Sequence, residues 1–412
     1  MTSTFSISSR SNSTQRKSLL ALVIPISLML SAASAMFEGW IETGMQIGAL
    51  TTLLAIGVLT GEKRFIEGRF YQESKVGGLL LILFVCSATV SSISSENQLS
   101  SLAYVVGIAI CLLVCSGVWI LSPSELLNDL KIYVIATAIS ALVIWRLTPD
   151  LGRRFGGVVH PNYWGLVCLS IFCLAALIKN LLFRSAIQLV SIAIIFASQS
   201  RSALLSVLAA SCVFGYFCFR SARISKDIKL LLMVGIVTGT MVAFATAKEQ
   251  IYDEFASAFR INDPYRGVGS GFSGRTALWR AGMDVLAAHP WFGVGAHMES
   301  NFISVGGITQ AHNGYINTLV QFGTIGSGLF FGFFILSFWR LLCLARTSAP
   351  GASVGVALVI GYAVEAIFEP KLLNIGNPVS IVVLMFLLRP VGKTELGKIN
   401  GAPYPYPVLL FR

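Results

Sequence analysis

The sequence predicts an all-α protein that crosses a membrane many times. Of the 412 residues, 55% are hydrophobic and only 12% are charged, whereas soluble domains carry about 25% charged residues. Apolar stretches of roughly 20 residues, the length that spans a bilayer as a helix, recur along the chain. One segment of 65 residues, 248–312, interrupts them. We therefore expect residues 1–412 to form a single integral membrane domain with one long loop.

Twelve apolar segments account for most of the chain. They lie at residues 18–37, 43–60, 76–93, 99–121, 130–147, 163–179, 185–198, 202–219, 229–247, 313–339, 352–368 and 376–389. The expected architecture has about 12 transmembrane helices, with loop 248–312 between spans nine and ten carrying short amphipathic helices. The first segment also resembles a signal peptide, because basic residues precede it and a small-residue motif follows. Its length favours an uncleaved helix.

The basic residues indicate how the chain is oriented. Cytoplasmic loops are enriched in Lys and Arg, and with the N-terminus inside, 20 of the 30 basic residues lie on the inner side. Both termini are then cytoplasmic, and the long loop is on the outer, periplasmic side. The net charge of +11 fits membrane lipids better than nucleic acid, which we do not expect as a partner.

The basic residues left on the outer side are mostly arginines. Eight are Arg and only two are Lys, whereas ordinary solvated loops would mix the two. The planar guanidinium suits phosphate oxygens, so we interpret the set as an anion site. Lipid headgroups or nearby carboxylates are the alternative partners for any single arginine. The spans carry almost no charge near their midpoints, which argues against an ion-coupled transporter but leaves a lipid flippase open.

An amphipathic helix is expected within residues 273–288. Its apolar residues share one face; they are Leu278, Gly282, Val285 and Leu286. Ser273 is the expected N-cap, and Arg275 then falls in the first turn, where a cation opposes the helix dipole. A bound anion would reconcile the two; otherwise Arg275 reaches water or Asp284. The glycine-rich segment 267–274 lacks the strand and lysine of a phosphate loop, so we interpret it as a flexible connection.

The long loop ends at His312, one of four histidines. At the edge of the tenth span, His312 would meet the headgroup of a lipid-linked substrate. A histidine among arginines should have a lowered pKa and stay neutral, as a general base requires, although a lone histidine is more often structural. Earlier in the loop, the helix should stop at His289–Pro290. The glycines of 293–295 should allow a close approach of the chain to the bundle.

Two further outer segments carry polar residues. Arg153 and Arg154 precede His160 and Asn162, and Asn162 is a plausible helix cap. Arg201 lies in a tight turn between spans seven and eight, so it should be held rigidly.

Neither a metal site nor a disulfide framework is evident. The chain has no Asp-x-Asp pair and no His-Glu-x-x-His motif, so arginines would have to balance phosphate charge in place of a metal. We expect no cofactor. All eight cysteines lie within or beside apolar segments, and we interpret them as small apolar residues.

Together these segments resemble the O-antigen ligase and polymerase family of bacterial envelope glycosyltransferases. The resemblance covers about residues 150–330 and depends on the order of several short motifs. They are His160-Pro-Asn162, Ser200-Arg-Ser-Ala203, Gly274-Arg-Thr with Trp279, His289-Pro-Trp-Phe-Gly-Val-Gly295, and Ala311-His-Asn-Gly-Tyr315 followed by Gln321-Phe-Gly323.

The resemblance implies a metal-independent, inverting glycosyltransferase of lipopolysaccharide biosynthesis in the bacterial inner membrane. Its donor would be a glycan linked to undecaprenyl or another polyprenyl diphosphate, and its acceptor lipid A-core. By this resemblance His312 would activate the acceptor hydroxyl, and Arg275 and Arg201 would hold the diphosphate. Further diphosphate-binding candidates are Arg153, Arg154 and Arg280, and supporting candidates are Asn313, His160 and Asn162.

Other functions remain open. Polymerases of O-antigen or exopolysaccharide repeat units share these motifs, with a second lipid-linked glycan as acceptor. A lipid-linked glycan flippase would place its arginines in a central cavity. A non-catalytic assembly factor would keep the topology and tolerate loss of His312.

Overall fold

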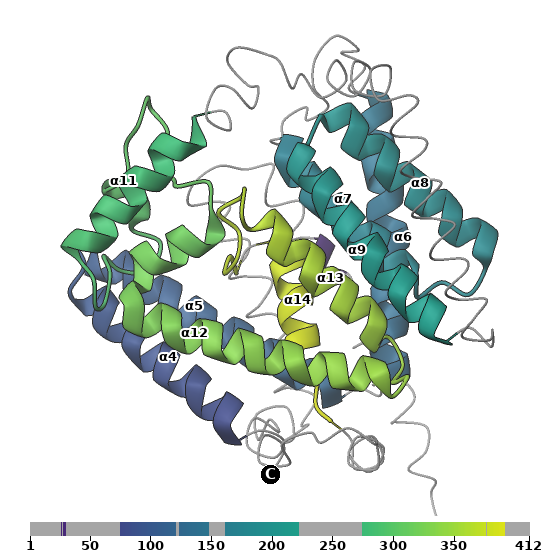
Figure 1. Ribbon diagram of the computed structural model, residues 1–412, viewed down its shortest axis with the longest axis horizontal. Helices are drawn as coiled ribbons and strands as arrows, with labels where there is room; N and C mark the ends of the chain where they lie inside the picture. The colour runs from purple at the N-terminus through teal and green to yellow at the C-terminus, as the bar shows by residue number, and fades with distance from the viewer. Residues whose placement is uncertain are drawn as a thin grey trace, which may run out of the picture.

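The computed structural model describes residues 26, 28–29, 75–120, 123–147, 161–221, 274–375 and 377–391. Within these residues the regular structure is helical, as the sequence predicts. The helices are α4 (Lys75–Ile93), α5 (Gln98–Gly117), α6 (Pro123–Leu147), α7 (Pro161–Ala175), α8 (Leu181–Ser198), α9 (Arg201–Ser221), α11 (Arg275–Ala288), α12 (Gly314–Arg346), α13 (Ala352–Glu365) and α14 (Pro378–Leu387), with short 3-10 turns η2 (Val118–Ile120) and η4 (Glu299–Asn301) (Figure 1).

Nine of the expected apolar segments coincide with helices α4–α9 and α12–α14. Six of these helices, α4, α5, α6, α8, α9 and α12, are long and apolar enough to cross a membrane. The expected spans at 18–37, 43–60 and 229–247 fall largely or wholly outside the described residues, as does the first part of the long loop. The count of twelve spans therefore stays a prediction.

The shorter helices α7, α13 and α14 lie at the centre of the described bundle. They have 15, 14 and 10 residues, fewer than the roughly 20 needed to cross a bilayer. All ten residues of α14 are buried. Figure 1 shows α13 and α14 between α12 on one side and α7 and α9 on the other. These helices carry almost continuous apolar sequence because neighbouring helices cover them on every side.

Helix α12 is broken near its start. Gly323 has φ 62° and ψ −170°, a conformation essentially restricted to glycine. The expected span 313–339 is therefore a short helix before Gly323 and a longer one after it. The break frees backbone groups that would otherwise bond within the helix, and these groups need other partners.

The segment after α11 supplies those partners. Thr324 N–H donates to the carbonyl of Pro290 at 2.8 Å and Ile325 N–H to that of Trp291 at 3.2 Å. In return, the N–H groups of Val294 and Gly295 donate to the carbonyls of Val320 and Gln321, at 2.9 and 3.1 Å. Residues 290–295 therefore act as a splint across the break in α12.

The expected close approach at the glycines of 293–295 is confirmed. A Cβ built on Gly293 would lie 2.4 Å from the Val320 carbonyl oxygen, and one on Gly295 would lie 2.5 Å from Cβ of Ser95. Both glycines have positive φ, 72° and 107°. Helix α11 ends at Ala288 with His289 as its C-cap, also as predicted. The cysteines form no disulfide.

Candidate functional site

The candidate site lies where three charged or titratable side chains from separate elements meet. Arg275 is the first residue of α11, His312 precedes α12 by two residues, and Glu369 follows α13. Arg275 Nη2 lies 2.9 Å from Glu369 Oε1, and His312 Nδ1 lies 4.0 Å from Glu369 Oε2. Side-chain exposure falls from 27% at His312 to 19% at Arg275 and 7% at Glu369.

The N-termini of four helices converge on residues 365–372. Asn162, near the start of α7, donates to Glu369 Oε1 at 2.6 Å, and Ser202, near the start of α9, donates to Glu365 Oε1 at 2.8 Å. Arg275 begins α11, and the Gly314 N–H at the start of α12 donates to the Ala366 carbonyl at 2.7 Å. Helix N-termini carry partial positive charge and favour anions. This end of the molecule therefore favours negative charge.

His312 is held in a fixed backbone conformation. Its φ is +47°, in the left-handed region that few side chains adopt. Just after it, Asn313 caps α12 by accepting from the N–H groups of Tyr315 and Ile316. Just before it, the Ala311 N–H donates to Asn317 Oδ1 at 3.2 Å. Bonds on both sides thus fix the ring where the loop meets the helix.

A buried carboxylate helps to hold the residues on either side of His312. Glu299 is 3% exposed and accepts from Gln321 Nε2 at 2.8 Å and from Asn317 Nδ2 at 3.4 Å. Burial raises the pKa of Glu299, while the charge of His297 and the bond from Gln321 lower it. Asn317 therefore links the buried acid of the loop to the backbone beside His312.

The His312 ring is only partly open to its surroundings. Its side chain is 27% exposed, and Nδ1 is buried with no hydrogen-bond partner among the described residues. Burial, together with the charges of Arg275 and Lys371, lowers the pKa of His312 to about 4. The imidazole is therefore neutral at pH 7, as expected from its arginine neighbours.

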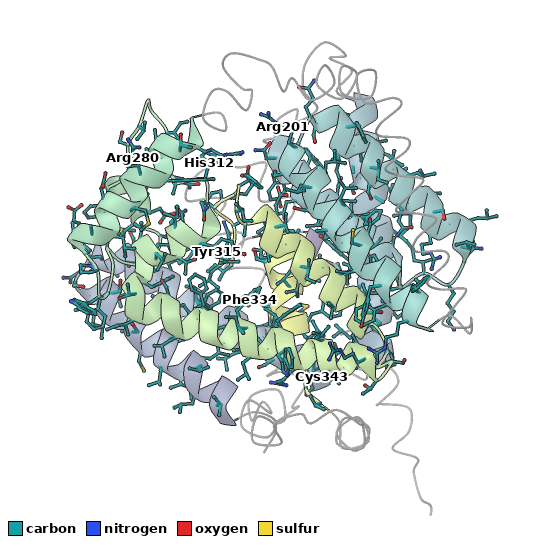
Figure 2. All side chains as sticks on the ribbon, in the orientation of Figure 1. Arg201, Arg280, His312, Tyr315, Phe334 and Cys343 are labelled. Atoms are coloured by element: carbon teal, nitrogen blue, oxygen red, sulfur yellow. The ribbon has the colours of Figure 1, made fainter. Side chains whose placement is uncertain are left out.

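Glu365 joins α13 to α9 one helical turn before Glu369. Its two oxygens accept separately from Ser202 at 2.8 Å and Ser206 at 2.9 Å. These bonds fix the register of α9 against α13, and Arg201 is the residue next to Ser202. Figure 2 shows Arg201 and His312 at the same end of the molecule, with Arg280 farther out along α11.

Several sequence-predicted residues meet here and others do not. Arg275, His312, Asn313 and Asn162 lie together, whereas Arg280 is exposed on α11. Arg153, Arg154 and His160 lie outside the described residues. Two capping assignments are wrong. Asn162 is the second residue of α7 rather than its cap, and the residue that caps α11 is Gly274, with φ 78°, not Ser273.

The acidic side of the site was missed by the sequence reasoning. Neither Glu369 nor Glu365 was among the residues expected at the site. The available signal was the run Glu369-Pro-Lys371 in a short segment between two apolar stretches. Charge in such a place indicates function. In the structure the Arg275 guanidinium pairs with this carboxylate, and the bound anion expected there stays a prediction.

Among the described residues, no three His, Cys, Asp or Glu side chains form a group that could hold a metal ion.

Comparison with known proteins identifies one family. Residues 186–331 match the family described as O-antigen ligase. The matched region runs from α8 through Arg201, Arg275 and His312 into α12. No curated protein matches the chain.

Proposed function

We propose that this chain, which carries the O-antigen ligase domain in residues 186–331, transfers a glycan from a polyprenyl diphosphate to an acceptor hydroxyl. The acceptor that we favour is lipid A-core, which makes the protein an O-antigen ligase. The reaction inverts the anomeric carbon and uses no metal ion.

The observation that carries this proposal is the pairing of a cation with a neutral, accessible base where four helix N-termini converge. Arg275 and the helix N-termini suit a diphosphate. His312, with a partly exposed side chain and its pKa near 4, is unprotonated at pH 7 and can accept a proton. A carboxylate already occupies this environment, so the site can hold negative charge near the base.

The reaction proceeds as a single displacement. The acceptor oxygen bonds to the anomeric carbon while the bond from that carbon to the diphosphate oxygen breaks. The electron pair leaves with the diphosphate, and the hydroxyl proton passes to His312 Nε2. Arg275 and Arg201 stabilise the growing charge on the leaving group. Because diphosphate leaves readily, the site needs a base and cations more than a strong acid.

The proposed location is the outer leaflet of the bacterial inner membrane, with both termini cytoplasmic. The distribution of basic residues supports this orientation. It places His312 and the first turn of α11 on the periplasmic side, where a lipid-linked donor and a lipid-borne acceptor lie in one plane. Confinement to one surface aligns the hydroxyl with the anomeric carbon.

Reconstitution in vesicles tests the proposal directly. The protein is given a polyprenyl-diphosphate glycan with either lipid A-core or a second lipid-linked glycan, each with and without a chelator. We expect transfer to lipid A-core that the chelator leaves intact. Chain extension without transfer to lipid A-core would make the protein a polymerase. Loss with chelator would overturn metal independence.

A pair of histidine variants tests the base. His312→Ala should abolish transfer although the protein inserts and expresses normally. The matched control is His289→Ala, because His289 is exposed and makes an edge contact with Phe302, 5.7 Å between ring centroids. It should keep most of the activity. Normal transfer by His312→Ala would show that His312 is not the base, and donor translocation without transfer would favour a flippase.

A further inference from the structure

One carboxylate lies beside both the proposed diphosphate-binding residue, Arg275, and the proposed base, His312. Glu369 Oε1 accepts from Arg275 Nη2 at 2.9 Å and from Asn162 Nδ2 at 2.6 Å. Its other oxygen, Oε2, lies 4.0 Å from His312 Nδ1, too far for a hydrogen bond. Among the described residues, none is a hydrogen-bond partner for the buried His312 Nδ1 atom. Buried polar atoms without partners are rare and call for an explanation.

We propose that Glu369 exchanges partners during the reaction, bonding Arg275 when no donor is present and moving onto His312 Nδ1 when the donor diphosphate binds Arg275. This inference rests on the proposed function. It assigns Glu369 as a positioning residue, since the carboxylate touches neither the acceptor nor the anomeric carbon.

Electrostatics gives the exchange its direction. A diphosphate carries more negative charge than a carboxylate, and its oxygens also match the guanidinium fork. Once it holds Arg275, the Glu369 carboxylate loses its counter-charge and is repelled by the phosphate oxygens. His312 Nδ1 lies 4.0 Å from Glu369 Oε2 and can serve as the donor in its protonated tautomer. Glu369 Oε2 must approach it by roughly 1 Å to reach hydrogen-bond distance.

Asn162 provides the pivot for this movement. Its amide bonds Oε1, the oxygen farther from the histidine contact, and is itself placed by the first turn of α7. A carboxylate anchored at Oε1, which is 7% exposed as it stands, can turn Oε2 toward His312. The movement that the proposal needs is a rotation of this side chain.

The new bond would change what His312 can do. An Nδ1–H that donates to a carboxylate fixes the tautomer with the lone pair on Nε2 and raises the basicity of the ring. The charged groups around the ring are Arg275, Lys371 and Glu369, with Glu365 one turn behind. Without donor, the Glu369 carboxylate is paired with Arg275. When donor binds, its diphosphate pairs with Arg275, and the Glu369 carboxylate is free to bond to His312.

Nitrogen NMR of the full chain tests the exchange. The protein, labelled with ¹⁵N-histidine and placed in lipid nanodiscs, is titrated with pH in the absence and presence of polyprenyl diphosphate without glycan. Its four histidines give few signals, and His312→Gln identifies the relevant one. We expect the probe to set the Nδ1-protonated tautomer. It should also raise the titration midpoint by about one to three pH units, the shift that a nearby opposite charge produces.

Two variants separate the exchange from a general effect of charge. Glu369→Gln should still bind the probe but lose the change at His312. Asp284→Asn, which removes an exposed carboxylate of α11, should behave like the wild type. In kinetics, Glu369→Gln should lower kcat by about tenfold or more with a smaller change in the KM for donor, as expected for a group that supports the base.

The outcomes distinguish this inference from the proposed function. If the probe binds and the wild-type His312 signal neither shifts nor changes tautomer, the exchange is wrong and the proposed function stands. This comparison does not use Glu369→Gln, so misfolding of that variant cannot obscure it. The same shift in Glu369→Gln as in the wild type would also overturn it. If the probe does not bind at all, the proposed function fails and the exchange fails with it.

Discussion

Gly323→Ala offers a direct test of how the structure holds His312. A Cβ at Gly323 would lie 2.3 Å from the carbonyl carbon and oxygen of Trp291. These are backbone atoms of the splint, so they cannot rotate away as a side chain could. The segment must move, and the bonds that Thr324 and Ile325 donate to Pro290 and Trp291 must lengthen or break.

The expected cost follows from those contacts. A non-glycine residue in this backbone region costs about 1–3 kcal/mol. Two lost hydrogen bonds, at about 0.5–1.5 kcal/mol each, bring the total to about 2–6 kcal/mol. His312 lies eleven residues before Gly323, just ahead of the helical segment that the break at Gly323 ends. Displacing it by about 1 Å would reduce transfer on the order of a hundredfold.

Gly328→Ala is the matched control on the same helix. A Cβ at Gly328 meets nothing within 4 Å, and Ala is favoured over Gly inside a helix by roughly 0.5–1 kcal/mol. Unfolding of both variants in mixed detergent micelles, followed by tryptophan fluorescence, gives the stabilities, and the vesicle assay gives transfer. Equal stability and equal transfer in the two variants would refute the splint.

Three shorter predictions concern the site itself. Arg275→Lys should lose most transfer because an ammonium cannot replace the guanidinium fork, whereas Arg280→Lys, at an exposed position, should lose little; equal losses would show that charge alone matters. The pH profile of kcat/KM should stay level down to about pH 5 and fall with a midpoint near 4, because protonation of His312 with its lowered pKa removes the base; a midpoint near 6.5 would contradict the burial of the ring. Ser206→Ala should weaken donor binding several-fold, because it removes one of the bonds that hold Glu365 and fix the register of Arg201. The KM for donor should rise while kcat stays nearly unchanged. An unaltered KM would argue against a role for the bonds between Glu365 and α9.

Much of the helical architecture follows from local sequence. Apolar runs of sufficient length predict helices whatever surrounds them, because a backbone in lipid must satisfy its own hydrogen bonds. This is why the segments at 76–93 and 202–219 agree closely with α4 and α9. The stop at His289–Pro290 is equally local, since proline cannot continue a helix.

Local sequence could not predict the break in α12. The run after His312 is mostly apolar, and a glycine in such a helix is usually an ordinary helical glycine. What breaks the helix is the splint of residues 290–295, which supplies replacement hydrogen bonds from about 30 residues earlier in the chain. Such an exchange depends on two segments meeting in space.

The basic half of the candidate site was predictable and the acidic half was not. Arg275 and His312 stand out because each is unusual where it occurs: an arginine opposing a helix dipole, and a histidine at the end of the long loop. Glu369 looks ordinary in sequence, a single acid before a proline. Its importance arises only when α7, α11, α12 and α13 bring Asn162, Arg275 and His312 around it. Sequence determines which groups carry charge and where helices begin; the tertiary structure alone decides which charges meet, because pairing depends on distances between elements far apart in the chain.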